Sequence, residues 1–288
     1  MIKLATIAGS DASGGAGLEA DLKTFQEYGV YGMAAVTVIA TMNPDKEWGH
    51  EVFPLDEQTI RAQLETIFKG IGVNAAKTGM LATNYAVELS AEYLKKYNVE
   101  NYVLDPVMVC KGGDLALNPE LNNLIIKKLL PLAKLITPNL FEAGQIAKMP
   151  TPSTIEEIKE GCEFAAKYGA DIYVTANIIA HDENFEGLDE FLMALQDAGV
   201  RGIIVADPYI IERCKTVAPK VEVHISTQQS ISNYKEVRYW ESEGVHRVVL
   251  ARETGYEEIK EINNISHISE SFKLDYRICE ERIKYLDS

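Results

Sequence analysis

The sequence predicts an α/β protein built on mostly parallel β-sheet. Short apolar runs alternate with amphipathic stretches along most of the 288 residues, which is the pattern of repeated βαβ units. Glycine and proline gather just after the apolar runs, where sheets of this class bind ligands. With 47% hydrophobic and 25% charged residues, the chain can bury a sizeable core. We therefore expect one large domain or two modest ones.

The first half alternates predicted strands with predicted helices. Apolar runs predict strands at 4–8, 34–40, 75–77, 102–107 and 135–137. Amphipathic stretches predict helices at 17–28, 57–69, 84–97, 120–131 and 140–148. Right-handed crossovers between such units bring the carboxyl ends of the strands to one edge of the sheet.

The second half repeats this rhythm. Helices are expected at 154–168, 187–198, 209–216, 230–243 and 255–262, and strands at 172–177, 202–206, 221–225 and 247–251. The strands begin roughly 20–30 residues apart, which is typical of a (β/α) barrel or a piece of one. The pattern then fades, and 270–286 is predicted as one polar terminal helix. A Pro-rich linker at 149–153 divides the chain into parts at 1–150, 151–262 and 263–288.

Charge and cysteine content narrow the class of partner and the compartment. The net charge is -15, whereas binding to a nucleic-acid backbone needs clustered Lys and Arg. No run reaches the ~18 apolar residues of a membrane helix, and the N-terminus lacks a signal-peptide layout. The cysteines, which form no C-x-x-C pair, are Cys110, Cys162, Cys214 and Cys279. We expect a cytoplasmic protein with free thiols and no nucleic-acid or membrane partner.

A glycine-rich run, A-G-S-D-A-S-G-G-A-G at 8–17, follows the first predicted strand and opens a helix. Glycines let backbone N–H groups approach a ligand closely. Within this run Asp11 places a short carboxylate at the mouth of the sheet, suited to a ring nitrogen or a hydroxyl. The alternative interpretation is a tight turn in which Asp or Ser caps the helix.

Two further predicted strands end in polar residues. Asp105 ends one strand, where a carboxylate can take Mg²⁺, and glycines in the loop after Cys110 allow it to close as a lid. The Cys110 side chain is either a reactive thiol or a small buried apolar group. Asn139 and Glu142 lie three residues apart at a predicted helix N-terminus. That spacing suits a metal–phosphate site, or simply helix capping.

In order and spacing, these motifs resemble those of the bacterial pyridoxal/hydroxymethylpyrimidine kinases of the ribokinase-like superfamily. The resemblance covers 1–149 and includes K-T-G-M-L at 77–81, D-P-V-M-V-C-K-G-G at 105–113 and T-P-N-L-F-E at 137–142. The form T-M-N-P at 41–44 favours the pyridoxal branch. The resemblance implies transfer of the ATP γ-phosphoryl group to a hydroxymethyl group on a pyridine or pyrimidine ring, with ATP and Mg²⁺ as cofactors.

The same resemblance assigns roles to individual residues. It implies that the ring is bound by Asp11, Gly14, Gly15, Met42, Met80 and Val107. Cys110 becomes a lid thiol that can add to the pyridoxal aldehyde. Asn139 and Glu142 serve the nucleotide phosphates, and Asp105 and Glu142 serve Mg²⁺. The expected partner is the small ring substrate, and a homodimer is compatible with these features.

The second half resembles something else. Residues from about 153 to 262 are similar to part of the barrel of the collagenase-like peptidases, whose relatives include RNA and ubiquinone-precursor hydroxylation proteins. The similar segments are 155–165, 173–181, 203–208, 224–228 and 247–253. At strand ends, the functional face of such a barrel, the resemblance places Asn177, Asp207, Ser226, Gln228, Arg252 and Glu253. Capping or solvated loop residues are the alternative for each.

One motif of the kinase resemblance is missing. Such kinases carry a later G-A-G-C or G-x-G-D loop whose amides stabilise the moving phosphoryl group, yet no two glycines after Gly113 are separated by a single residue. Cys214, in I-E-R-C-K, has no glycine beside it. The sequence thus predicts a chimera with three interpretations: a kinase with weak turnover, a ligand-binding or inactive protein, or a hydrolase or hydroxylation protein acting through the second half.

Overall fold

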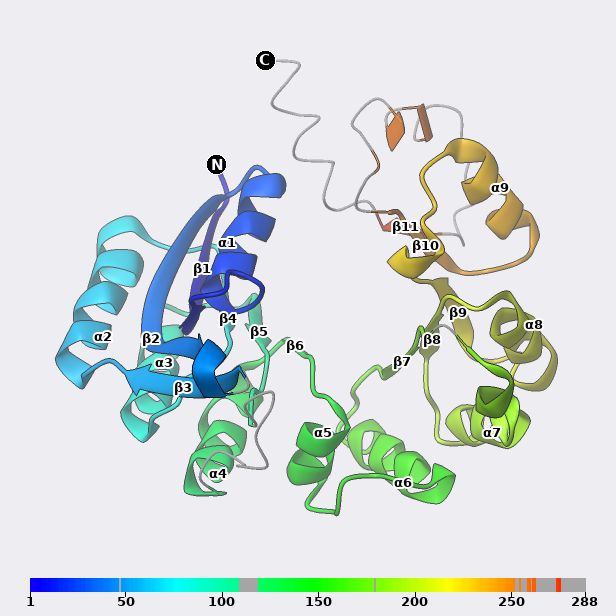
Figure 1. The fold of residues 1–288 in the computed structure, drawn as a ribbon, viewed down its shortest axis with the longest axis horizontal. Helices are drawn as coiled ribbons and strands as arrows, with labels where there is room; N and C mark the ends of the chain where they lie inside the picture. Colours follow the sequence, from blue (N-terminus) through cyan, green and yellow to red (C-terminus); the bar gives the residue numbers. More distant parts are fainter. Residues whose placement is uncertain are drawn as a thin grey trace. The chain divides into compact units, whose positions relative to one another are not determined.

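The chain folds into two compact units, Met1–Thr151 and Pro152–Ser288, in a computed structural model. The structure describes residues 1–46, 48–108, 119–178, 180–251, 254, 258–259, 261–262 and 273–275. Figure 1 traces the elements of both units from blue to red. Each unit has its own sheet and its own buried core, and the first ends one residue beyond the boundary predicted for it.

A six-stranded sheet organises the first unit. Its strands are β1 (Lys3–Asp11), β2 (Tyr31–Asn43), β3 (Gly49–Pro54), β4 (Ala75–Thr78), β5 (Tyr102–Leu104) and β6 (Leu135–Ile136). They lie in the order β3-β2-β1-β4-β5-β6, and all neighbours are parallel except β2 and β3. Each strand predicted in this half is present. The antiparallel β3 was not predicted, because its mostly exposed G-H-E-V-F-P sequence contains no long apolar run.

The helices of the first unit occupy the predicted positions. They are α1 (Gly17–Glu27), α2 (Glu57–Leu64), α3 (Asn84–Lys96), α4 (Pro119–Lys128) and α5 (Leu140–Ala147). A π-helical segment, Glu65–Ile71, continues α2, and short 3₁₀ turns lie at Pro44–Lys46 and Leu130–Leu132. Side chains start two of these helices: Asp56 accepts from the N–H of Thr59, and Thr83 accepts from the N–H of Ala86. Such caps satisfy N–H groups that a helix leaves unpaired.

The centre of the first sheet is buried and largely apolar. Ala5 and Ile7 of β1 are fully buried, as are Tyr102 of β5 and Tyr93 of α3. The order of the strands reverses at β1, which has β2 on one side and β4 on the other. Ligands bind outside the carboxyl ends of strands at such a reversal point. The buried strands therefore hold a candidate site at this edge.

The second unit is built on a separate, five-stranded parallel sheet. Its strands are β7 (Tyr173–Ala176), β8 (Gly202–Val205), β9 (Glu222–Ile225), β10 (Arg247–Val249) and β11 (Lys273–Asp275). Its helices are α6 (Ile155–Ala166), α7 (Leu188–Asp197), α8 (Pro208–Val217) and α9 (Tyr234–Ser242), with 3₁₀ turns at Asp182–Phe185 and Thr227–Gln229. The strands are neighbours in chain order. This is the order of successive (β/α) barrel units.

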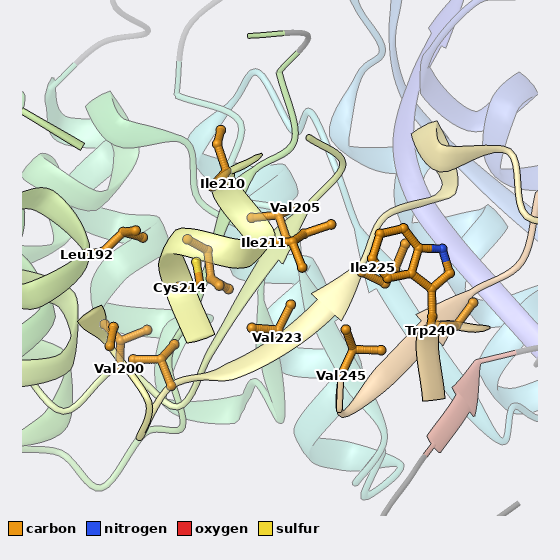
Figure 2. Close-up of a cluster of buried hydrophobic side chains, with 14 of the residues drawn as sticks. Leu192, Val200, Val205, Ile210, Ile211, Cys214, Val223, Ile225, Trp240 and Val245 are labelled. Carbon is orange, nitrogen blue, oxygen red and sulfur yellow. The ribbon is translucent and has the colours of Figure 1, made fainter. Parts of the chain in front are cut away.

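The core of the second unit lies between this sheet and its helices. In the view of Figure 2, Cys214 of α8 lies between Leu192 of α7 and Val223 of β9, and Trp240 of α9 lies near Val245. Cys162 and Cys214 are both buried free thiols. Burial raises the pKa of Cys214 to about 12, so this thiol is protected from reaction in the folded unit.

The polar terminal helix predicted at 270–286 is wrong where the structure describes it. Residues Lys273–Asp275 form β11, which pairs in parallel with β10 in the register Val248↔Leu274. The surrounding sequence F-K-L-D-Y alternates apolar and polar residues with a period of two, which favours a strand.

Within the described part of the chain, no helix is long and apolar enough to cross a membrane.

Candidate active site

A cavity of about 370 Å³ opens at the carboxyl edge of the first sheet. Its walls come from the ends of β1, β4, β5 and β6, from the β2–β3 hairpin and from the starts of α1 and α5. The predicted site residues that line it are Asp11, Met42, Met80, Asp105, Val107, Asn139 and Glu142. Gly14 and Gly15 belong to the same loop as Asp11 but are not part of the wall. Cys110 lies outside the described residues.

The loop from β1 to α1 is held together by the Asp11 carboxylate. The backbone N–H of Ser13 donates to Oδ1 (2.9 Å), and the Ser13 hydroxyl and the N–H of Ala16 donate to Oδ2 (2.8 and 2.9 Å). Burial alone would raise the pKa of Asp11, but these hydrogen bonds outweigh it and hold the pKa below its usual value. Asp11 therefore stabilises the tight turn and also lines the cavity. Its role in the turn is visible in the structure, and its predicted role toward a ligand is compatible with its position.

Gly17 closes this loop against β1. Its φ of 62° lies in the left-handed region, and a Cβ there would lie 2.5 Å from the carbonyl oxygen of Gly9. Only glycine fits such a position. The Glu19 carboxylate adds a second tie, because it accepts from the Ser10 hydroxyl (2.5 Å) and the N–H of Asp11 (2.8 Å).

One wall of the cavity is largely apolar. Met42 is paired with His50 in the β2–β3 register, and Val52 of β3 lines the cavity beside them. Met80, in the loop that follows β4, also lines this wall. Its carbonyl oxygen accepts a hydrogen bond from the buried Thr37 hydroxyl (2.7 Å). His50 and Val52 were missed from the sequence because β3 was not predicted.

A lysine in the central strand β4 ties three elements together. The Lys77 ammonium lies 3.1 Å from Asp21 Oδ1 of α1 and 3.4 Å from Asp105 Oδ2 after β5. Asp21 also accepts from the fully buried hydroxyl of Thr6 (2.6 Å). Lys77 was not singled out from the sequence, although a charged side chain within a buried strand signals charged partners nearby.

Asn139 and Glu142 form a reciprocal capping box at the start of α5. The Asn139 side-chain oxygen accepts from the N–H of Glu142 (3.0 Å), and Glu142 Oε2 accepts from the N–H of Asn139 (2.9 Å). Glu142 Oε1 also accepts from the N–H of Met108 (3.2 Å). Burial, together with the nearby charge of Asp105, raises the pKa of Glu142 despite these hydrogen bonds. The capping interpretation thus describes real contacts, and both side chains still line the cavity.

The residues predicted to hold Mg²⁺ do not form a ready pair of ligands. Each carboxylate oxygen of Glu142 accepts a backbone N–H, and one oxygen of Asp105 lies beside the Lys77 ammonium. A positive charge at that distance opposes a direct bond from Asp105 to a cation. Mg²⁺ is normally held by one or two carboxylates together with waters and substrate phosphates. The two carboxylates are therefore partly occupied and do not form a preassembled pair of ligands, and their role toward Mg²⁺ stays a prediction.

In the second unit, the predicted strand-end residues mostly satisfy local hydrogen bonds. The Asp207 carboxylate caps α8 by accepting from the N–H groups of Tyr209 and Ile210. Asn177 Nδ2 donates to the buried Ser226 hydroxyl oxygen (3.2 Å), which also accepts from the N–H of Gln228 (3.3 Å). Arg252 and Glu253 lie outside the described residues. Among the described residues, no group of three or more His, Cys, Asp or Glu is placed to hold a metal ion. Hydrolase or hydroxylation chemistry here stays a prediction.

Comparison with known families identifies both halves. A family model described as phosphomethylpyrimidine kinase matches residues 11–196. The chain belongs to this kinase family. A second model, peptidase family U32, matches residues 149–277. Both predicted resemblances are confirmed, although the kinase model runs further along the chain than the predicted limit at 149.

Individual relatives give the same division. Pyridoxine kinase of Bacillus subtilis is 53% identical over 174 residues, which is 60% of this chain and 64% of that protein. An ADP complex of Bacillus subtilis pyridoxal kinase has a TM-score of 0.55 at 53% identity and covers 59% of this chain and 64% of that one. The tRNA hydroxylation protein P1 of Bacillus subtilis is 67% identical over 109 residues, which is 38% of this chain but 26% of that protein. The chain thus spans less than two thirds of these kinase relatives, and the predicted ribokinase-like α/β fold of the first half is confirmed.

Proposed function

We propose that the chain is an ATP-dependent kinase acting on the hydroxymethyl group of a pyridine or pyrimidine ring. The observation that carries the proposal is the cavity at the reversal point of the first sheet. It combines apolar side chains from β2, β3 and the loop after β4 with a carboxylate at the end of β1 and another just after β5. A flat heterocycle with polar substituents needs this combination, because apolar walls hold the ring and a few polar groups fix its orientation.

In this proposal, each residue has a defined task. Met42, Met80 and Val107 contact the faces of the ring, and the Asp11 carboxylate orients a ring nitrogen or hydroxyl with its remaining lone pairs. Asn139 and Glu142 lie at the α5 N-terminus, where backbone N–H groups and the helix dipole favour phosphate. The reaction then depends on positioning and on stabilising the charge of the transferring group. No step of the proposal relies on a protein-bound metal.

The test is ADP release from ATP in a Mg²⁺ buffer, with pyridoxal or hydroxymethylpyrimidine as the acceptor. We expect ADP to form only when a ring acceptor is present, together with one equivalent of phosphorylated ring. A well-folded chain that releases no ADP with either ring contradicts the proposal. Comparison of the two rings in the same assay measures which one is preferred.

A second candidate function is ring binding without turnover. It is favoured by the sequence after Gly113, which holds no pair of glycines separated by one residue, so the usual phosphoryl-stabilising loop has no counterpart. Removing one such donor costs ~10²–10³ in kcat in characterised enzymes. This function predicts a rise in thermal stability with pyridoxal and no ADP release. An unchanged melting temperature at saturating pyridoxal contradicts it.

A further inference from the structure

A threonine stands in the centre of β2 where the strand pattern favours an apolar side chain. Alternate residues of β2 face the core, and Met33 and Ala35 are buried there. Thr37 is the next residue in this alternation and is 0% exposed. Valine has nearly the same shape without a polar atom, whereas a buried hydroxyl costs free energy unless it is hydrogen-bonded. The partner of this hydroxyl therefore indicates what the threonine does.

The partner belongs to a wall of the cavity. The Thr37 hydroxyl donates to the carbonyl oxygen of Met80 (2.7 Å), in the loop after β4. Because β1 lies between β2 and β4 in the sheet, this bond joins segments on either side of β1. The carbonyl oxygen of Thr37 accepts from the N–H of Leu55 (3.0 Å), the first residue after β3. One residue thus ties the β2–β3 hairpin to the loop after β4.

Both of these segments form the apolar side of the cavity. The hairpin supplies Met42 and Val52, and the loop supplies Met80. Thr37 itself is buried and does not line the cavity. It can therefore affect a ligand only through the segments that it holds. Walls that are already fixed in the binding geometry lose less freedom when a ligand arrives, which strengthens binding.

We propose that Thr37 is a positioning residue that fixes the β2–β3 hairpin and the loop after β4 against each other, and thereby sets the affinity of the site for its ring substrate. The inference rests on the proposed kinase function. The hydroxyl holds Met80 at its main chain, so the Met80 side chain meets the ring from a constant position. Nucleotide binding does not depend on Thr37, because the α5 N-terminus lies outside the segments that this residue ties together.

The first test measures ring binding without turnover, by titration calorimetry with pyridoxine. Thr37→Val removes the hydroxyl and keeps the shape, and it should raise the dissociation constant about tenfold, near the upper limit for one neutral hydrogen bond. Thr37→Ser keeps the hydroxyl and should recover most of the affinity. If Thr37→Val does not fold, Thr37→Ala against Thr37→Ser gives the same comparison, since both lack the methyl group. Equal binding with and without the hydroxyl overturns the proposal.

The matched control is Thr78→Val. It removes another fully buried hydroxyl of the same sheet, one that shares a hydrogen bond with the Tyr102 hydroxyl (2.5 Å) rather than with a wall of the cavity. This variant should leave the dissociation constant of pyridoxine unchanged. Equal losses in Thr37→Val and Thr78→Val would assign the effect to general loosening of the sheet and overturn the proposal.

The second test asks whether the effect passes through Met80. In Met80→Ala the ring has lost this contact, so adding Thr37→Val should raise the dissociation constant by less than about twofold more. A further tenfold loss in the double variant overturns the role of Met80.

The kinetic split separates this inference from the kinase function. Thr37→Val should raise KM for the ring about tenfold and leave kcat and KM for ATP within about twofold, as expected when uniform binding is lost. A fall in kcat with unchanged KM overturns the proposal. If the unmodified chain binds pyridoxine and shows the predicted Thr37 effects but releases no ADP, the kinase function fails while the inference stands. An unmodified chain that binds no ring overturns both.

Discussion

Single backbone positions decide whether the first loop can form. Gly17 has a positive φ and lies under the Gly9 carbonyl, whereas Gly29, with a φ of 65°, has no atom within 4 Å of the point that a Cβ would occupy. The two glycines therefore separate the cost of a left-handed backbone from the cost of a steric clash. This contrast cannot be seen in the sequence, where both are ordinary glycines.

Gly17→Ala should destabilise the first unit more than Gly29→Ala does. The left-handed conformation costs an ordinary residue roughly 1–2 kcal/mol, and at Gly17 the 2.5 Å approach to Gly9 adds to that cost. Chemical denaturation measures the stability of each variant. Titration calorimetry with pyridoxal should show weakened binding for Gly17→Ala only. Equal losses of stability, with equal binding, contradict the assignment.

His224 should make the second unit sensitive to mild acid. Its side chain is 4% exposed, and burial lowers its pKa from 6.5, with Arg247 and His246 adding to the effect and Glu222 opposing it. Below about pH 6.5 the His224 imidazole binds a proton in the unfolded chain but stays neutral in the folded unit. The free energy of unfolding therefore falls as the pH drops below about 6.5. Glu222 has a lowered pKa and therefore loses its own contribution only at more acidic pH.

The measurement for His224 is urea denaturation between pH 7 and pH 5. The unmodified chain should lose stability over this range, and His224→Gln should flatten the slope even if it lowers stability throughout. An unchanged slope in His224→Gln means that other groups carry the dependence.

Among the elements, the first turn of α5 combines folding with the site. Asn139 caps this helix in a reciprocal box with Glu142, and Thr154 with Glu157 forms the same box at α6. The α5 box lines the cavity, whereas the α6 box belongs to the second unit. The chain thus provides a matched pair of caps with and without a role at the cavity.

Asn139→Ala and Thr154→Ala should each lower the stability of their own unit by about 1 kcal/mol, the usual cost of losing such a cap. Only Asn139→Ala should weaken binding of pyridoxal and ATP, because its helix N-terminus lines the cavity. Denaturation monitored by circular dichroism and titration calorimetry measure the two effects. Weaker binding in Thr154→Ala would contradict this division.

Strand and helix positions could be predicted wherever apolar spacing carried the signal. β1, β4 and their neighbours follow apolar runs, and motif spacing correctly brought Asp11, Asp105 and Glu142 to one edge. The misses have physical causes. β3 is exposed and gains its structure from pairing with β2, and β11 forms by pairing with β10. Such long-range pairing leaves a weak trace in local sequence, so His50 and Val52 were missed with β3.

At the scale of the whole molecule, the residues that the structure describes form two separate cores. The first surrounds Tyr93 and Tyr102, and the second surrounds Leu192 and Ile225. The two units have separate sheets and match different families. The net charge of -15 is shared between two units and is not the charge of one surface. The homodimer stays a prediction.

Scanning calorimetry should resolve two unfolding transitions. Units with separate cores can unfold independently, and a ligand stabilises the unit that binds it. Pyridoxal should raise only the transition that Gly17→Ala lowers, whereas Leu192→Ala, which empties part of a core at a typical cost of 2–5 kcal/mol, should lower the other. A single transition that shifts with pyridoxal, with Gly17→Ala and with Leu192→Ala would show that the two units unfold together.

Burial of Cys162 and Cys214 gives the second unit a built-in probe of its own opening. Both thiols are buried while the unit is closed, Cys162 with 8% and Cys214 with 1% of its surface exposed, and burial raises the pKa of both. Their labelling rates therefore report how often α6 and α8 detach from their sheet. Since one cysteine lies on each helix, mass spectrometry of partly labelled chains would distinguish fraying of one helix from opening of the whole unit.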